Sequence, residues 1–311
     1  MDALPPTRPP DRITEQQYDM IRYLRRIKKT NPRKLMFIQP LFMQFEFGPF
    51  QRIHEILRRT DADIGPAVNL WCSNRVEAEE RYGHIGYWDV SSVTNMMELF
   101  KAKANFNDDI THWDVSKVTN MDSMFWNART FNQAIGNWDV SKVTDMGFMF
   151  SKAENFNQSI GDWDVSKVTK MAYMFSFSLA FNQPIGDWNV SKVTEMDSMF
   201  SGARSFNQPI GAWDVSKVTK MDFMFRGARS FNQPIGAWDV SSVTFGGGMF
   251  WNVTSERFMF ADCPISNANK PARFRGGGAK NTRRARRRAS RKRSQKGRRT
   301  LKRGSKRTRR R

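Results

Sequence analysis

The sequence predicts an α/β repeat solenoid, with one short strand and one short helix in each 25-residue repeat and a disordered basic tail at the C-terminus. Tryptophan recurs at a constant spacing of 25 residues, the apolar period changes within each repeat, and basic residues concentrate at the end of the chain. A solenoid grows by stacking units that cannot bury their apolar face alone, so we expect the tryptophans to form a continuous core. They are Trp88, Trp113, Trp138, Trp163, Trp188, Trp213 and Trp238.

The first residues of each repeat predict the strand. In the repeat that begins at Trp163, Ile160, Trp163 and Val165 follow the L-x-x-L-x-L spacing of a leucine-rich repeat, with other apolar residues in place of leucine. The alternation indicates that Trp163 and Val165 point inward and that Asp164 points outward.

The following residues predict the helix. Apolar residues then recur at spacings of three and four, which is typical of a helix with one buried face; in this repeat they are Val168, Met171, Met174, Phe175 and Leu179. In several repeats an aspartate lies three residues after a threonine, as Asp122 follows Thr119, which is the spacing of a capping box at a helix start.

Composition divides the chain into four parts. We expect an N-terminal segment of unassigned role (1–61), an N-terminal cap (62–87), seven repeats with a degenerate C-terminal cap (88–269) and an Arg/Lys-rich tail (270–311). The tail holds 22 of the 51 basic residues and no acidic one, which leaves 29 basic against 30 acidic residues elsewhere. The formal charge of +21 therefore belongs to the tail, which cannot collapse on an apolar core.

The tail predicts binding to nucleic acid or another polyanion. Arginine and lysine neutralise phosphates regardless of base sequence, and the candidate residues are Arg283, Arg284, Arg286, Arg287, Arg288, Arg291, Lys292 and Arg293. The same run fits a nuclear-import signal, an anchor on anionic lipid or a contact with the acidic residues of the repeats.

The repeated string W-D-V-S-x-V-T-x-M-x-x-M-F-x-x-A-x-x-F-N-x-x-I-G resembles the BspA-like leucine-rich repeat, from residue 82 to about residue 250. That family occurs in bacterial surface proteins, mycoplasma lipoproteins, protists and large DNA viruses. The resemblance implies a solenoid and, in bacteria, surface display with adhesion to host or matrix proteins. This chain departs from the bacterial pattern because its start, MDALPPTRPPDR, does not read as a secretory signal and because it carries a basic tail. The tail is similar to those of proteins from large DNA viruses or algal eukaryotes.

Candidate residues for protein binding lie where the repeats differ. One variable column on the predicted strand face is Tyr87, His112, Asn137, Asp162, Asp187, Ala212 and Ala237. A second column, expected on the outer face of the helix, is Glu98, Ser123, Phe148, Tyr173, Ser198 and Phe223. Exposed Phe148, Tyr173 and Phe223 would form an aromatic patch for a protein partner, and the alternative is that they pack against neighbouring turns.

Two uniform columns predict structural roles. The first, Asp89, Asp114, Asp139, Asp164, Asn189, Asp214 and Asp239, is interpreted as satisfying donors of a turn or of the neighbouring repeat, with an acidic binding stripe as the alternative. The second, Asn107, Asn132, Asn157, Asn182, Asn207 and Asn232, predicts an asparagine ladder between repeats.

No catalytic, cofactor or metal site is predicted. The three histidines lack a serine or cysteine nucleophile at motif spacing, and two cysteines form neither a disulfide framework nor a metal cluster. No apolar run reaches the length of a membrane span. We therefore expect a non-enzymatic scaffold for a protein partner that is intracellular, with the nucleus and the virion as candidate locations; the alternative is a surface, adhesion or structural virion protein.

Overall fold

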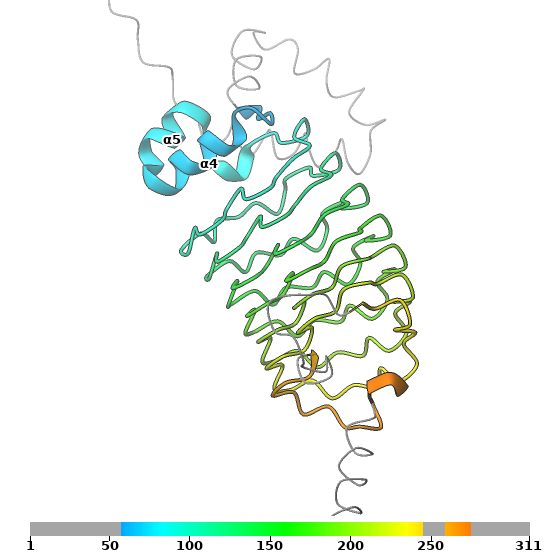
Figure 1. Cartoon of the computed structure of the whole chain (residues 1–311). Coiled ribbons are helices and arrows are strands. Elements are labelled where there is room, and N and C mark those ends of the chain that lie inside the picture. Colours follow the sequence, from blue (N-terminus) through cyan, green and yellow to red (C-terminus); the bar gives the residue numbers. More distant parts are fainter. Residues whose placement is uncertain (1–56, 245–258, 275–311) are drawn as a thin grey trace, which may run out of the picture.

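The computed structural model describes residues 57–244 and 259–274. It contains the helices α4 (Ile64–Ser73) and α5 (Arg75–Tyr82) and the single 3₁₀ turns η1 (Ile85–Tyr87) and η2 (Ala272–Phe274). Figure 1 shows α4 and α5 at one end of a stack of backbone coils and η2 at the other end. Each coil corresponds to one 25-residue repeat.

Helices α4 and α5 cover the first coil. Ile64, Val68 and Trp71 of α4 are buried, and the Trp71 ring meets the Trp88 ring edge-on at 6.2 Å. The Trp71 Nε1–H group donates to Asp108 Oδ2 at 2.9 Å. These contacts join the segment predicted as an N-terminal cap, residues 62–87, to the first repeat.

Neighbouring coils are joined by backbone hydrogen bonds at one register. Parallel bridges pair Asn95 with Asn120 and continue at steps of 25 residues as far as Lys220. In one repeat, the N–H groups of Met171, Tyr173 and Phe175 donate to carbonyls of the next coil at 2.7–2.9 Å. Every second amide of this segment therefore points along the stack.

The repeats do not contain the expected short helix. In the described part of the repeats, residues 88–244, the backbone forms turns and isolated bridges, with no helix and no extended strand. Tyr173 and Phe177 have φ angles of +59° and +56°, and the equivalent residues of the other repeats also have positive φ. An α-helix would direct every amide to the residue four earlier and would keep φ negative. The amides that join the coils are thus incompatible with a helix here.

The same turns still bury four of the five apolar residues that suggested a helix, and the fifth, Leu179, is half-buried. The residues Val168, Met171, Met174 and Phe175 have relative exposures of 0%. The alternation predicted for the strand also holds, because Trp163 and Val165 are buried and Asp164 is exposed.

Aromatic side chains form continuous columns through the stack. All seven repeat tryptophans are buried, with relative exposures of 1–5%. Phe125, Phe150 and Phe175 stack on one another with ring centroids 5.6–5.7 Å apart, and each also stacks on a second phenylalanine of its own coil at 3.8–4.0 Å. The coils therefore share one core.

The asparagine column forms the predicted ladder. The Asn157 side-chain oxygen accepts a hydrogen bond from the Asn182 backbone N–H group at 2.9 Å, and the Gln183 side-chain amide donates to the Asn157 backbone carbonyl at 2.9 Å. Asn107, Asn132, Asn182 and Asn207 accept the equivalent backbone bond from the following repeat.

Both ends of the stack carry substitutes for a missing neighbour. At the first coil, the Asp61 carboxylate accepts from the backbone N–H groups of Thr94 and Asn95 at 2.8 and 3.0 Å. At the last coil, Asn269 Nδ2 donates to the Asn232 carbonyl at 2.9 Å, where a repeat glutamine would otherwise donate. The Arg273 guanidinium donates to the Val240 carbonyl at 2.8 Å.

The packed body extends past the predicted start of the tail at residue 270. Phe274 has a relative exposure of 3% and meets the Phe260 ring at 5.9 Å. The residues from Lys270 to Phe274 therefore belong to the closing coil.

Candidate functional site

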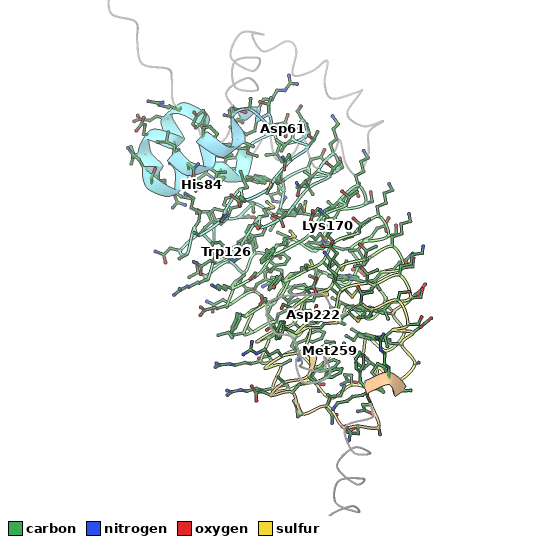
Figure 2. All side chains as sticks on the ribbon, viewed as in Figure 1. Asp61, His84, Trp126, Lys170, Asp222 and Met259 are labelled. Atoms are coloured by element: carbon green, nitrogen blue, oxygen red, sulfur yellow. The ribbon has the colours of Figure 1, made fainter. Side chains whose placement is uncertain are left out.

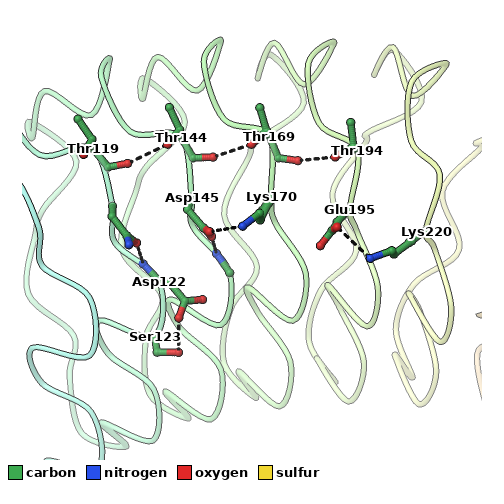
Figure 3. A network of polar contacts seen from close by, with 12 residues as sticks. Thr119, Asp122, Ser123, Thr144, Asp145, Thr169, Lys170, Thr194, Glu195 and Lys220 are labelled. Carbon is green, nitrogen blue, oxygen red and sulfur yellow. Dashed lines mark hydrogen bonds and ion pairs between the residues drawn. The ribbon is translucent and has the colours of Figure 1, made fainter. Parts of the chain in front are cut away.

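Variable side chains of consecutive repeats lie next to one another beside the ladder of bridges. The bridge column reads Asn95, Asn120, Asp145, Lys170, Glu195 and Lys220. Figure 3 shows this column together with the threonines that precede it. The threonine hydroxyls cap no helix: Thr144 Oγ1 donates to the Thr119 carbonyl at 3.2 Å, and Thr169 Oγ1 donates to the Thr144 carbonyl at 3.1 Å.

Opposite charges alternate along the bridge column. Lys170 Nζ lies 3.0 Å from Asp145 Oδ2, and Lys220 Nζ lies 2.9 Å from Glu195 Oε1. Both lysines have raised pKa values because of these hydrogen bonds. Ion pairs this exposed contribute little to the stability of the fold.

Asp122 lies beside this column and is half-buried. Its Oδ2 accepts from the Ser123 hydroxyl at 3.1 Å. Burial raises the pKa of Asp122, and Asp145 and Glu98 add to that rise, although the hydrogen bond from Ser123 opposes it. Gly147 makes room for the carboxylate, because a Cβ at residue 147 would lie 2.7 Å from Asp122 Oδ1.

The aromatic residues of the second variable column form a stacked pair. The rings of Phe148 and Tyr173 are 4.5 Å apart and nearly parallel, at 4°. Both side chains are half-buried, so the patch is partly accessible and partly packed against the neighbouring coil. Phe223 lies further along, with the Arg226 guanidinium 5.5 Å from its ring centroid. In the same column Ser123 and Ser198 are buried, with exposures of 8% and 4%.

A shallow depression of about 290 Å³ lies between Asp122, Phe148 and the bridge column. Met97, Asp122, Asp145, Phe148 and Lys170 line it, together with the backbone around Gly147 and Ala172. Met97 is 49% exposed at its rim. We call these lining residues, with Tyr173, the variable face.

The first variable column is only partly available to a partner. Tyr87 has a relative exposure of 8% and its ring lies 5.5 Å from the His84 ring, so this residue belongs to the first coil's interior. His112, Asp162 and Asp187 are exposed, as are Asn137, Ala212 and Ala237. They form an exposed row outside the depression, because none of them is among the residues that line it.

The aspartate column has the structural role that was favoured. In each coil the carboxylate accepts from the backbone N–H group two residues later, as Asp164 does from Ser166 at 3.0 Å. Hydrogen bonds from the side chain and backbone of Ser166 lower the pKa of Asp164. Asn189 accepts the same bond from Ser191 at 3.2 Å. This bond is local to one turn, so an acidic binding stripe is not needed to explain the column.

The remaining predictions concern the basic tail, metal sites and membrane spans. The tail candidates Arg283 to Arg293 lie outside the described residues. Within 57–244 and 259–274, no three or more His, Cys, Asp or Glu side chains are arranged to hold a metal ion. Of the helices in the described part of the chain, none has the length and apolar character needed to cross a membrane.

Sequence reasoning missed the glycine and the carboxylate that shape the depression. Gly147 takes the place of the aspartate three residues after Thr144, and its use as space for Asp122 depends on contact between two coils. A signal was present in the sequence, since positions 122 and 147 are equivalent and hold a carboxylate and a glycine in successive repeats.

Comparison with protein families gives two overlapping matches. Residues 72–185 and 158–261 match the family described as "Mycoplasma protein of unknown function, DUF285". Together these matches span 72–261, more than half of the chain, so the chain belongs to this family. The match supports the resemblance to BspA-like repeats and does not bear on a viral or protist origin. Searches of curated proteins and of solved structures found no match.

Proposed function

We propose that the repeats form a non-enzymatic solenoid scaffold of the leucine-rich-repeat type, which binds a protein partner through the variable face. The observation that carries this proposal is the depression, where residues that differ between repeats lie together. The stacked Phe148–Tyr173 pair supplies a rigid apolar contact, and Asp122, Asp145 and Lys170 supply polar contacts around it. Aromatic anchors surrounded by polar groups are typical of protein interfaces.

The basic tail supplies the second half of the proposed function, which is to hold the assembly on nucleic acid. Its charge supports this: residues 275–311 carry 20 Lys and Arg and no Asp or Glu. Arginine-rich segments bind phosphates without reading bases, and a nuclear-import signal uses the same chemistry.

The protein-binding half is tested by comparing partners of three full-length proteins. The double variant Phe148→Ala/Tyr173→Ala removes the aromatic pair, and Lys142→Ala/Lys167→Ala is the matched control at exposed positions of the same two repeats outside the depression. Quantitative mass spectrometry of affinity captures should show proteins that bind wild type and the control equally and that the aromatic variant loses about tenfold or more. Equal recovery with all three proteins would remove the variable face as the binding surface.

A surface or adhesion protein is the second candidate, which the resemblance to the BspA-like repeats of bacterial surface proteins implies. Surface labelling of intact cells or virions distinguishes the two. Protection of the chain until lysis supports the nucleic-acid-bound scaffold, whereas labelling before lysis supports the surface protein.

A further inference from the structure

One corner of the coils gathers cations and aromatic rings on the folded body itself. This corner comprises residues 101–105 and their equivalents in the following repeats. It is fixed by backbone bonds between coils: the Ala102 N–H group donates to the Trp126 carbonyl at 2.7 Å, and the Phe177 N–H group donates to the Ser201 carbonyl at 2.7 Å. Side chains at equivalent positions therefore project from adjacent coils in register. Figure 2 labels Trp126 at this edge of the stack.

The charge of the corner is strongly positive although the body is nearly neutral. Its seven cations are Lys101, Lys103, Arg129, Lys152, Arg204, Arg226 and Arg229. Two carboxylates occupy the same corner, Glu154 and Asp262, which leaves a net charge of 7 − 2 = +5. Only part of this charge is neutralised locally: Arg129 lies 3.7 Å from Glu154, and Lys101 lies 2.5 Å from Glu98 of the neighbouring column.

Another corner provides a contrast. There a lysine lies three residues after the Asp/Asn position of the structural column in five repeats: Lys117, Lys142, Lys167, Lys192 and Lys217. Six aspartates face five lysines, which gives 5 − 6 = −1. The folded body therefore separates its charge by corner.

Two aromatic side chains are interleaved with the cations. Phe177 is 49% exposed and lies against Gly202, where a Cβ would come within 2.7 Å of the Phe177 ring. Trp126 is half-buried, with Lys101 Nζ and Lys152 Nζ at 5.2 and 5.4 Å from its ring. Cations that follow a backbone and rings on which bases stack are the features that bind single-stranded nucleic acid.

We propose that this basic–aromatic edge, defined by the seven cations with Trp126 and Phe177, binds single-stranded nucleic acid. The arginines and lysines contact phosphates, and a base stacks on Phe177. Six coils at about 4.8 Å spacing place the first and last cations roughly 24 Å apart, which is long enough for several nucleotides. The edge lies on the folded repeats and does not depend on the tail, so the inference goes beyond the proposed function.

The charge of the edge is tested by the salt dependence of binding to a fluorescent oligo(dT) by full-length protein. The edge variant is Arg129→Gln/Lys152→Gln/Arg204→Gln, and the matched control is Lys117→Gln/Lys142→Gln/Lys217→Gln. Each phosphate contact on a single strand contributes about 0.7 to the log–log salt slope, so the edge variant should lower the slope by about 2. The control should leave the slope unchanged, because carboxylates already offset those lysines.

Stacking is tested separately with Phe177→Ala and Phe177→Tyr. The alanine variant should weaken oligo(dT) binding about fivefold or more at constant salt slope, and tyrosine should restore it. A bromodeoxyuridine-substituted oligonucleotide should photo-crosslink to Phe177 or Trp126. Unchanged thermal unfolding of each variant shows that the fold is retained.

A tail variant separates this inference from the proposed function. It replaces Arg283, Arg284, Arg286, Arg287 and Arg288 by Gln in the full chain. If edge and control variants have equal slopes and crosslinks fall only beyond residue 274, the edge is refuted and the tail proposal stands. If the edge variant weakens binding and the tail variant does not, the tail proposal fails and the edge stands.

Discussion

Six of the seven repeat tryptophans donate a hydrogen bond from the indole Nε1–H group to a backbone carbonyl earlier in the chain. Trp163 Nε1, for example, donates to the Ile135 carbonyl at 3.2 Å. Trp138 Nε1 is the exception: it is buried and has no acceptor among the described atoms. The Trp163 and Trp138 side chains are about equally buried, with relative exposures of 3% and 4%. Comparing the two residues therefore distinguishes the effect of the indole hydrogen bond from the effect of ring burial.

We predict that Trp163→Phe destabilises the protein more than Trp138→Phe. Both changes lose similar apolar area, but only the first removes an indole hydrogen bond, which contributes about 1 kcal/mol net. The Ile135 carbonyl keeps its bond from the Trp138 backbone N–H group, and the second change removes a buried indole N–H group that has no acceptor among the described atoms. Urea unfolding followed by circular dichroism measures the difference in the free energy of unfolding. Equal losses would mean that the indole bond contributes nothing net.

Asp122 and Asp164 predict opposite dependences of stability on pH. The folded pKa of Asp122 is raised by burial, so the folded state binds its proton more readily than the unfolded chain does. Its contribution to stability is present at low pH and is lost as pH rises through the folded pKa. The folded pKa of Asp164 is lowered by the Ser166 bonds, so its contribution is present above the unfolded pKa and is lost as pH falls.

The test compares Asp122→Asn and Asp164→Asn with wild type between pH 3 and pH 7. The free energy of unfolding of Asp122→Asn, relative to wild type, should rise with pH, because the amide removes the cost of a buried charge. The same difference for Asp164→Asn should fall with pH. Slopes of the same sign for the two variants would contradict the assignment.

At the level of elements, the sequence predicted which residues are buried more reliably than how the backbone buries them. Met171, Met174 and Phe175 are in the core as expected, but turns with positive φ hold them there. Spacings of three and four residues are shared by a helix and by consecutive turns of this kind. What decides between them is that the Tyr173 amide bonds the next coil, and no single repeat contains that information.

Asp61 is predicted to stabilise the first coil as a cap. Its carboxylate accepts from Thr94 Oγ1 at 2.6 Å in addition to two backbone N–H groups. Asp61→Ala should cost about 1 kcal/mol, as the loss of a helix N-cap does. Asp162→Ala is the matched control, an exposed aspartate in the repeats. Hydrogen exchange should show faster exchange at the Thr94 and Asn95 amides, and unchanged exchange there would contradict the cap.

For the whole molecule, the period of 25 residues predicted the stack, the shared core and the asparagine ladder, because each follows from placing identical residues in register. The candidate site was harder to predict. The partial burial of Phe148 and Tyr173 depends on their stacking between coils, and the burial of Tyr87 depends on its packing near His84. The basic–aromatic edge was not predicted from the sequence, because its cations occupy different positions in successive repeats.

Truncation should locate the end of the folded body. Removal of residues 275–311 should leave thermal unfolding unchanged, because the contacts that close the last coil are made by residues up to Phe274. Removal of residues 270–311 also deletes buried Phe274 and the Arg273 bonds to Val240 and Val243, and should cost about 3–5 kcal/mol. Differential scanning calorimetry of the two truncated proteins measures the difference. Identical transitions would place the boundary before residue 270, as composition alone suggested.

The substitutes at the two ends of the stack bear on how copies of the chain can associate. Asp61 already accepts hydrogen bonds from backbone N–H groups of the first coil. Asn269 and Arg273 already donate to backbone carbonyls of the last coil. A second molecule that approached head to tail would find those groups occupied, so fibre growth by edge-to-edge pairing is disfavoured at these sites. We therefore expect copies of the chain to associate through the sides of the stack. The number of stacked coils is then fixed by the repeats of a single chain.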